Sequence, residues 1–579
     1  SVDWFCLSRF DSETVFAALL GNRNHGRWLL APIGADNPES NSFVADRHYQ
    51  TSTFILQTQW ETGSGGVLVS EFMPIGESGT ALIRRIQGLH GRVRLRQELL
   101  FRFGYGRVVP WVRRVHDDDG EALLAIAGPH AAILRADTLP TAQPDYSHAC
   151  EFTVDEGQVL DLQLHCFPSH ELPPAATDVD LALKATNRFW TNWSSNYARR
   201  GIYDSEVERS LLVLRALTYE ATGGIVAAPT TSLPEQFGGQ RNWDYRYCWL
   251  RDAALTIEAM MTHGLRREAL LWRNWLLRTI AGDPGDLQIM YGVAGERDLP
   301  ERVLDHLPGY EGSVPVRIGN GAVKQHQGDV VGEVMVALER LRSQGVHEDH
   351  FSWPLQRNLL SFVENNIQRS DHGIWEMRGE NRYFTHSRVM MWAALDCGVR
   401  AVQEHGLDGP AERWAELRDG LRLEILQFGF NSELYSFTQA YGGTNVDASL
   451  LILPQVRFVD YADERMLGTV ARLEHELLDG TGLLLRYRTD DGSDGLAPGE
   501  NPFLACSFWL VEQYAMSGRF REAKELMEKL VLTGNELGLL AEEYDTTSNR
   551  MAGNYPQALS HLALIRAADA LHRGLHGPS

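Results

Sequence analysis

Three segments of this 579-residue chain bring carboxylates together with Trp, Tyr and Arg side chains. They run from Gln240 to Asp252, from Gly373 to Glu380 and from Gly538 to Asp545. Aromatic rings offer flat faces on which sugars stack, and Arg/Asp pairs can hydrogen-bond neighbouring sugar hydroxyls. Cleavage of a glycosidic bond needs two carboxyl groups, one to protonate the leaving oxygen and one to activate water. The three segments therefore suggest a sugar site with hydrolytic chemistry.

Each segment alone also fits a purely structural role. Arg251 and Asp252 at a helix start could form an ion pair, with the acid stabilised by the helix dipole. The Trp and Tyr residues could fill a core, and Glu542 and Glu543 could be solvated surface charges. The occurrence of all three segments in one chain favours a functional site.

Up to about residue 166 the sequence has the pattern of short strands without helices between them. In residues 92–96, for example, apolar and charged side chains alternate, which places one face in a core and one in water. Many such strands predict an antiparallel sandwich in residues 1–167. The strand-like runs are 53–60, 66–72, 81–89, 93–101, 122–126, 132–134, 151–154 and 159–166.

The pattern then changes to helices. Leu172-Pro173-Pro174 breaks the strand pattern, so we place a linker with one helix in residues 168–204. From residue 205 roughly twelve helical runs follow, which fit a closed ring of helical hairpins or an open solenoid. No repeat of fixed period is present, and this favours the ring. After a first run from 205, they lie near 252–263, 265–280, 326–343, 354–369, 386–405, 409–427, 446–453, 461–475, 502–516, 519–533 and 555–572.

The composition excludes several classes of protein. Acidic residues outnumber basic ones by 76 to 54, and the net charge of −22 argues against nucleic acid or an anionic membrane as partner. No stretch approaches the ~20 apolar residues of a membrane helix. The six cysteines form no CxxC pair, so we expect reduced thiols and a cytoplasmic protein. Neither HExxH nor a P-loop occurs, and we expect no metal and no cofactor.

Several motifs together resemble glycoside hydrolase family 15, the bacterial glucoamylase, glucodextranase and trehalase family. They are the three segments above, the opening residues 3–12, Phe384-Thr385-His386-Ser387 and the segment 553–558. The likeness spans essentially the whole chain. It implies an N-terminal antiparallel β-sandwich (1–167), a linker with a helix (168–204) and a catalytic (α/α)6 barrel (205–579). The resemblance also excludes an open solenoid as the fold of the helical part.

The resemblance implies roles for eight residues. Glu376, in Trp-Glu-Met-Arg-Gly, matches the general acid of the family, and Glu542, the first glutamate of Ala-Glu-Glu-Tyr-Asp, matches its general base. Glu380 and Glu543 fall outside the catalytic positions. The other six match substrate-binding residues: Tyr245 beside the nucleophilic water, Trp249, Arg251 and Asp252 around the terminal glucose, Trp375 beside the acid, and Arg488 as a sugar-binding arginine.

By resemblance the protein is an exo-acting α-glucoside hydrolase that releases β-D-glucose with inversion. Glu376 then needs a raised pKa, which desolvation in an apolar surround provides, whereas Glu542 must stay ionised. Inversion also requires ~6.5–9.5 Å between the two carboxyl groups, because a water molecule lies between sugar and base.

The expected partner is a small α-glucoside. We favour trehalose, because a single catalytic unit without a starch-binding domain resembles the trehalases of the family. Glucoamylase or glucodextranase activity on malto- or isomalto-oligosaccharides is the alternative, and a transglucosylase is a further one. A non-catalytic sugar-binding protein is the alternative from another class. Discrimination between substrates is expected in loops such as 309–321 and 489–501.

Overall fold

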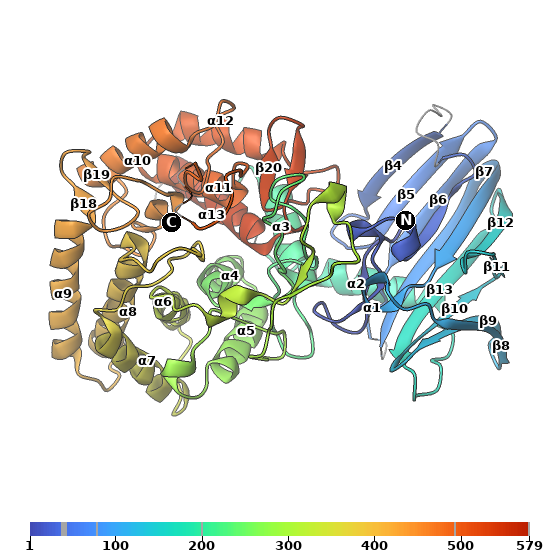
Figure 1. Ribbon diagram of the computed structural model, residues 1–579, viewed down its shortest axis with the longest axis horizontal. Coiled ribbons are helices and arrows are strands. Elements are labelled where there is room, and N and C mark those ends of the chain that lie inside the picture. The colour runs from blue at the N-terminus through green and yellow to red at the C-terminus, as the bar shows by residue number, and fades with distance from the viewer. Residues whose placement is uncertain (36–42, 77–78, 199–200, 491, 493, 577–579) are drawn as a thin grey trace. The chain divides into compact units, whose positions relative to one another are not determined.

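Strands form the first part of the chain and helices form the second (Figure 1). The computed structural model describes residues 1–35, 43–76, 79–198, 201–490, 492 and 494–576. The chain divides into two compact units, Ser1–Asn196 with Leu304–Gly312, and Tyr197–Val303 with Ser313–Ser579. This division differs from the predicted boundaries, since the linker helix and the segment Leu304–Gly312 both group with the first unit.

The strands of the first unit pair in antiparallel fashion. The longest, β7, pairs through its first half with β6 and β13, and through its second half with β3 and β12. The strands are β1 (Phe5–Cys6), β2 (Thr14–Phe16), β3 (Arg27–Pro32), β4 (Phe43–Tyr49), β5 (Leu56–Thr62), β6 (Gly65–Phe72), β7 (Thr80–Leu100), β8 (Trp111–Asp117), β9 (Gly120–Ala127), β10 (His130–Ala136), β11 (Thr141–Ala142), β12 (His148–Asp155) and β13 (Val159–Pro168), with the one-turn helix α1 (Phe103–Gly106) after β7.

β7 corrects the sequence prediction of two separate strands, 81–89 and 93–101. The structure has one continuous strand, because Gly91 takes a left-handed φ of 63° that bends the chain without ending the pairing. A Cβ at Gly91 would lie 2.4 Å from the backbone oxygen of Ser64, so a side chain does not fit there. The bend lets both halves of β7 contribute to a single core.

This core and the linker helix lie on opposite faces of β7. Ile86 belongs to the main core of the unit, whereas Ile83 packs against α2 (Val179–Ser194). Residues three apart on a strand point to opposite faces, which explains the difference. α2 begins at Asp178, whose side chain accepts the N–H of Leu181 and caps the helix. The predicted antiparallel sandwich is confirmed.

The second unit contains a ring of helices. The inner elements α4, α6, α8, η6, α11 and α13 contact one another in that order, and α13 contacts α4 to close the ring. Each inner element also contacts an outer helix, α5, α7, α9, α10, α12 and α3 respectively; α8 contacts α7 as well, and α13 contacts α12 as well. The α-helices are α3 (Asp204–Ala216), α4 (Arg251–Thr262), α5 (Arg266–Thr279), α6 (Val330–Ser343), α7 (Ser352–Asn366), α8 (Thr385–Gln403), α9 (Ala411–Phe428), α10 (Glu464–Leu477), α11 (Leu504–Met516), α12 (Phe520–Val531) and α13 (Ala558–His576). This arrangement is the expected (α/α)6 barrel.

Sequence pattern decides which helices lie inside. In α11 every residue from Leu504 to Ala515 is buried, as expected for a helix surrounded by others. In α12 the buried residues are Ala523, Leu526, Met527 and Leu530, a single stripe at helical spacing. One inner position departs from the prediction: the run 446–453 forms only the short 3-10 helix η6 (Ala448–Ile452), and Pro454, which lacks an N–H, follows it.

Short strand pairs and 3-10 turns shape the loops of both units. In the part of the chain that the structure describes, no helix has the length and apolarity needed to cross a membrane. The short elements are β14 (Cys248–Trp249), β15 (Met290–Tyr291), β16 (Arg302–Val303), β17 (Arg317–Ile318), β18 (Phe430–Asn431), β19 (Ser436–Phe437), β20 (Glu543–Asp545), β21 (Arg550–Ala552), η1 (Ala18–Leu20), η2 (Arg23–His25), η3 (Pro284–Asp286), η4 (Tyr310–Gly312) and η5 (Gly321–Lys324).

Candidate active site

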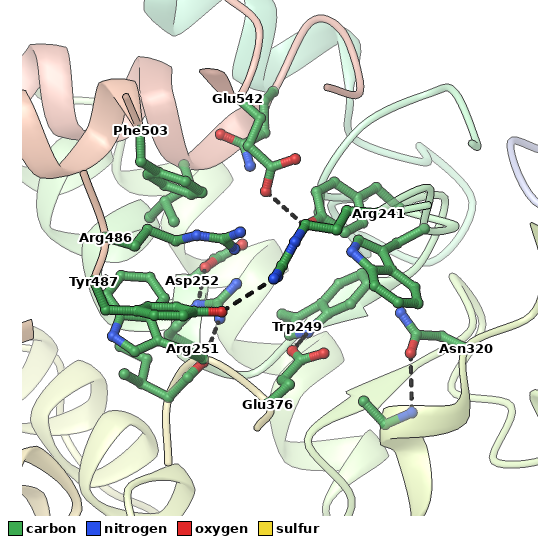
Figure 2. A pocket seen from close by; sticks show the side chains of 18 of the residues that line it. Arg241, Trp249, Arg251, Asp252, Asn320, Glu376, Arg486, Tyr487, Phe503 and Glu542 are labelled. Atoms are coloured by element: carbon green, nitrogen blue, oxygen red, sulfur yellow. Dashed lines mark hydrogen bonds and ion pairs between the residues drawn. The ribbon is translucent and has the colours of Figure 1, made fainter. Parts of the chain in front are cut away.

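A pocket in the helical unit gathers the three segments singled out in the sequence (Figure 2). Its walls come mainly from the loops that lead into the inner helices α4, α8, α11 and α13. The lining residues are Ala227, Arg241, Trp243, Tyr245, Trp249, Arg251, Asp252, Asn320, Ala322, Ile374, Trp375, Glu376, Arg378, Arg486, Tyr487, Leu496, Phe503, Glu542, Gln557 and Leu559. Seven of the eight predicted site residues are therefore in one pocket; Arg488 is not.

The carboxyl groups of Glu542 and Glu376 enter this pocket from opposite sides and point toward one another (Figure 2). Glu542 lies directly before β20 and is only 1% exposed. Its Oε1 accepts a 2.6 Å hydrogen bond from the hydroxyl of Tyr245. Gly553, with a φ of 82°, makes room for it, since a Cβ there would lie 2.7 Å from the Cβ of Glu542. Sequence and packing thus fix this carboxylate in one place.

Glu542 stands beside a buried group of charged residues that the sequence did not reveal. Arg486 donates from Nη2 to Oε2 of Glu235 at 2.8 Å and from Nε to Glu500, and its Nη2 lies 3.5 Å from Oε1 of Glu543. All four of these side chains are at most 9% exposed. The guanidinium of Arg486 is thus surrounded by three carboxylates, and its charge also acts on a fourth, that of Glu542.

This environment changes the expected protonation of Glu542. Burial, and after it the negative charge of Glu235, raises the pKa of Glu542 to about 8, although Arg486 and the Tyr245 hydroxyl act in the opposite direction. Burial also raises the pKa of Glu543 well above its ordinary value. The proposed role requires Glu542 to be ionised, and in the structure burial and the charge of Glu235 oppose its ionised form.

Glu376 is held by a different set of contacts. Its Oε1 accepts a 2.8 Å hydrogen bond from Nε1 of Trp249, and its backbone oxygen accepts one of 3.1 Å from the amide of Gln325. Its φ of 57° is rare for a residue with a side chain, and such backbone costs ~1–3 kcal/mol. Burial raises the pKa of Glu376, opposed chiefly by the charge of Arg251. A raised pKa is what the proposed acid needs.

The remaining predicted residues, apart from Arg488, line the same pocket. Arg251 begins α4, where its Nε donates to Oδ1 of Asp252 at 3.1 Å and its Nη1 donates to the backbone oxygen of Ile374 at 3.3 Å. Trp375 donates from Nε1 to Oδ2 of Asp447 at 2.9 Å. Both contacts lock side chains that would otherwise rotate, as a site for one sugar ring requires.

The predicted arginine Arg488 lies elsewhere. Its side chain is 55% exposed, and its Nη1 is 3.7 Å from Oδ2 of Asp490. Arg486, two residues earlier, lines the pocket in its place. The confounding acids are also separated: Glu380 is exposed, and Glu543 is turned to Arg486 and does not line the pocket.

Comparison with known proteins identifies the family of this chain. Residues 201–569 match the family model described as glycosyl hydrolases family 15, and residues 1–138 match the one described as trehalase-like, N-terminal. The chain belongs to glycosyl hydrolase family 15. It is 34% identical to a protein named trehalase from Thermoplasma acidophilum, over 98% of this chain and 96% of that protein.

Other similar proteins are likewise named as glycoside hydrolases. A protein named trehalase from Mycobacterium tuberculosis is 34% identical over 98% of this chain and 86% of its own length. The crystal structure of a bacterial glucoamylase complexed with acarbose superposes with a TM-score of 0.73 at 13% identity, covering 98% of this chain and 93% of that chain. The fold is therefore shared with a glucoamylase, and the family membership makes this chain a glycoside hydrolase.

Several pocket residues of this family 15 member were missed by sequence reasoning. Arg241, Trp243 and Tyr487 line the pocket, and Glu235 and Arg486 set the charge around Glu542. Arg241 and Trp243 lie inside the segment 240–252, and this position is a sequence signal for pocket residues. Arg486 and Arg488 are both in Arg-Tyr-Arg, and nothing in that tripeptide distinguishes the buried arginine from the exposed one.

Proposed function

We propose that this protein is an α,α-trehalase that works with inversion, Glu376 acting as general acid and Glu542 as general base. The observation that carries the proposal is the pair of glutamates facing one another across one pocket, each fixed by a hydrogen bond from an aromatic side chain. Two carboxyl groups in one pocket are what glycoside hydrolysis uses, and inversion is proposed from the resemblance to family 15. A non-catalytic sugar-binding protein would have no need for both.

In the proposed reaction each residue has one task. Glu376 donates its proton to the oxygen between the two sugars while Glu542 takes a proton from a water molecule, whose oxygen attacks C1 from the opposite face. Tyr245, whose hydroxyl touches Glu542, orients that carboxylate. Arg251, Asp252, Trp249 and Trp375 hold the glucose unit that is attacked, which places C1 between acid and base.

The choice of trehalose as substrate rests on the relatives. Proteins named trehalase align with this chain over nearly its full length, whereas the glucoamylase resembles it in fold alone. Hydrolysis of malto- or isomalto-oligosaccharides is the competing activity, because all these substrates present the same terminal glucose. We further propose a cytoplasmic location, supported by the six cysteines, which are scattered along the sequence without a CxxC pair.

Substrate specificity is tested by incubating the purified protein with trehalose, maltose, isomaltose and a longer α-glucan, and measuring the initial rate of glucose release. We expect kcat/KM to be highest for trehalose. A higher kcat/KM for maltose or isomaltose would favour glucoamylase or glucodextranase activity instead. No glucose release from any of the four substrates would favour the sugar-binding alternative.

A further inference from the structure

A second cavity of the helical unit has a volume of about 440 Å³ and shares no lining residue with the pocket of Glu376 and Glu542. Its walls come from the segments 285–289 and 323–327, the first turn of α6 and the C-terminal end of α7. Binding sites for small molecules usually have volumes of ~300–1,000 Å³. The second cavity is therefore large enough for a ligand bigger than a single ion.

Three cations line the second cavity. Lys324 and Arg369 are exposed, and their side chains have no hydrogen-bond or ion-pair partner among the residues that the structure describes. Arg297 donates to the backbone oxygens of Asp286 at 3.0 Å and of Thr279 at 3.3 Å. Asp286 is the single acidic residue in the lining. In a chain with 76 acidic and 54 basic residues, three such cations in one cavity favour an anionic ligand.

The first turn of α6 adds backbone donors to this cavity. α6 begins at Val330, and both Val330 and Val331 line the cavity. The preceding residue, Asp329, makes no capping hydrogen bond through its side chain and does not line the cavity. Within the described part of the chain, the N–H groups of Val330 and Val331 therefore have no acceptor. Free N–H groups at the start of a helix bind anions such as phosphate.

Neutral polar side chains line much of the remaining surface. Gln288, Gln325 and Gln327 contribute amide groups. Burial, and after it the charge of Arg369, lowers the pKa of His326 to about 4, so its imidazole is neutral near pH 7. Amides and neutral imidazoles can both donate to and accept from hydroxyl groups. A lining of cations and amides fits a sugar that carries a phosphate group better than it fits a phosphate ion alone.

Gln325 connects the second cavity with the proposed acid. Its Nε2 donates to the backbone oxygens of Glu376 at 3.1 Å and of Met377 at 3.2 Å. An amide nitrogen has two N–H groups, so these two bonds use both of them. Gln327, which also lines the cavity, donates from Nε2 to Oε1 of Gln325 at 3.5 Å. A ligand that binds Gln325 or Gln327 therefore acts on the backbone that holds Glu376.

We propose that the second cavity is a regulatory site that binds a phosphorylated sugar and lowers turnover at Glu376. The phosphate contacts Lys324, Arg369 and the start of α6, and the sugar hydroxyls contact the glutamine amides. A hydroxyl that competes for the N–H groups of Gln325 weakens the support of the Glu376 backbone. The effect on turnover rests on the proposed function, whereas the binding site does not.

Calorimetric titration with glucose 6-phosphate tests the binding site. The test protein is the double variant with Lys324→Ala and Arg369→Ala. The matched control carries Arg302→Ala and Lys524→Ala, which also removes one exposed Arg and one exposed Lys, neither of which lines either cavity. Both double variants therefore have the same net charge.

We expect the test variant to bind glucose 6-phosphate ~10–100-fold more weakly than the wild type, as for the loss of charged hydrogen bonds. The control should stay within about twofold of the wild type, since surface substitutions rarely have larger effects. No binding by the wild type, or equal binding by the wild type and the test variant, would overturn the site. Inorganic phosphate that binds the wild type as tightly as glucose 6-phosphate would overturn the phosphorylated sugar as its ligand.

Initial rates of trehalose hydrolysis test the connection to Glu376. At saturation, glucose 6-phosphate should lower kcat of the wild type ~5-fold or more, a usual size for coupling between two sites, and leave KM nearly unchanged. The same concentration should have little effect on the test variant. A rise in KM alone, equal in both proteins, would place the sugar phosphate in the pocket of Glu376 and Glu542 and overturn the inference. If trehalose is not hydrolysed at all, the proposed function fails and the titration still decides the site.

Discussion

Tyr245 and Trp249 pack edge to face, with ring centroids 5.4 Å apart, and each holds one of the two facing glutamates. The Tyr245 hydroxyl binds Glu542 and the Trp249 indole N–H binds Glu376. Both rings come from the loop that leads into α4, so one short segment sets the positions of both proposed catalytic groups. A change in Tyr245, which holds the proposed base, is therefore expected to affect the chemical step more than substrate binding.

Replacing Tyr245 by Phe should lower kcat ~10–100-fold while KM changes little. The 2.6 Å bond to Glu542 is of the charge-assisted kind, for which ~1.5–3 kcal/mol is usual. Because this bond favours the ionised carboxylate, its loss should also raise the pKa of Glu542 and shift the limb of the pH profile that Glu542 sets to higher pH. Steady-state kinetics across pH measure both effects. An effect on KM alone would show that Tyr245 only binds sugar.

The pH dependence of kcat/KM should be bell-shaped, with one limb set by each glutamate, because only the form with Glu542 ionised and Glu376 protonated is active. Burial and Glu235 raise the pKa of Glu542 to about 8, so the limb that belongs to Glu542 should lie well above the range of ordinary carboxylates. Burial also raises the pKa of Glu376, which sets the other limb. Initial rates measured across pH locate both limbs, and a profile with both limbs in the ordinary carboxylate range would contradict this prediction.

Glu235→Gln tests the origin of the limb that belongs to Glu542. The amide keeps an acceptor for Arg486 but removes the negative charge that raises the pKa of Glu542. The limb set by Glu542 should then move to lower pH, while the limb set by Glu376 stays in place. Glu301→Gln, which neutralises a carboxylate that pairs with Arg378, serves as control. A pH profile that does not move in Glu235→Gln would contradict the assigned cause.

Variants of the two glutamates should differ in how their activity depends on the leaving group. Glu376→Gln should lose ~10²–10⁴-fold of kcat on trehalose, because the linking oxygen leaves unprotonated. It should keep most of its activity on α-D-glucosyl fluoride, since fluoride leaves without a proton. Glu542→Gln should lose both activities, as water needs a base in either case. Initial rates with each substrate measure these losses. Equal losses in both variants would contradict the assignment of Glu376 as acid and Glu542 as base.

Arg486 and Arg488 should differ in stability as well as activity. Arg486→Met leaves Glu235, Glu500 and Glu543 buried without their cation, and breaking such pairs costs ~3–5 kcal/mol. Arg488→Ala removes an exposed side chain and should change the free energy of unfolding by about 0.5 kcal/mol or less. Urea unfolding followed by circular dichroism measures the difference. Comparable destabilisation by both variants would show that the charges around Arg486 are not stabilising.

The fold was predictable because it depends on repeated local patterns. Alternation marked most strands and helical periods marked most helices, including the fully buried α11. Two elements were not predictable in this way. The break expected near Gly91 did not occur, since glycine bends a strand as well as ending one, and η6 was too short to be distinguished from a helix.

The pocket was predictable where function-bearing residues cluster in the sequence. Segments containing Tyr245, Glu376 and Glu542 were dense in aromatic and charged side chains, and they meet in space. The charges around Arg486 come from positions up to 308 residues apart, Glu235 and Glu543, and only the folded chain brings them together. Their effect on the pKa of Glu542 could not be derived from sequence, because it depends on burial and distance.

The most direct test of the account is the anomeric form of glucose released from trehalose, followed by proton NMR in the first moments of hydrolysis. Inversion at the attacked carbon gives one β-glucose, while the leaving glucose keeps its α-configuration, so the account predicts equal initial amounts of both anomers. Glu376→Gln and Glu542→Gln should release neither at a comparable rate. Initial release of α-glucose alone would mean retention, and would contradict the assignment of Glu542 as a base acting through water.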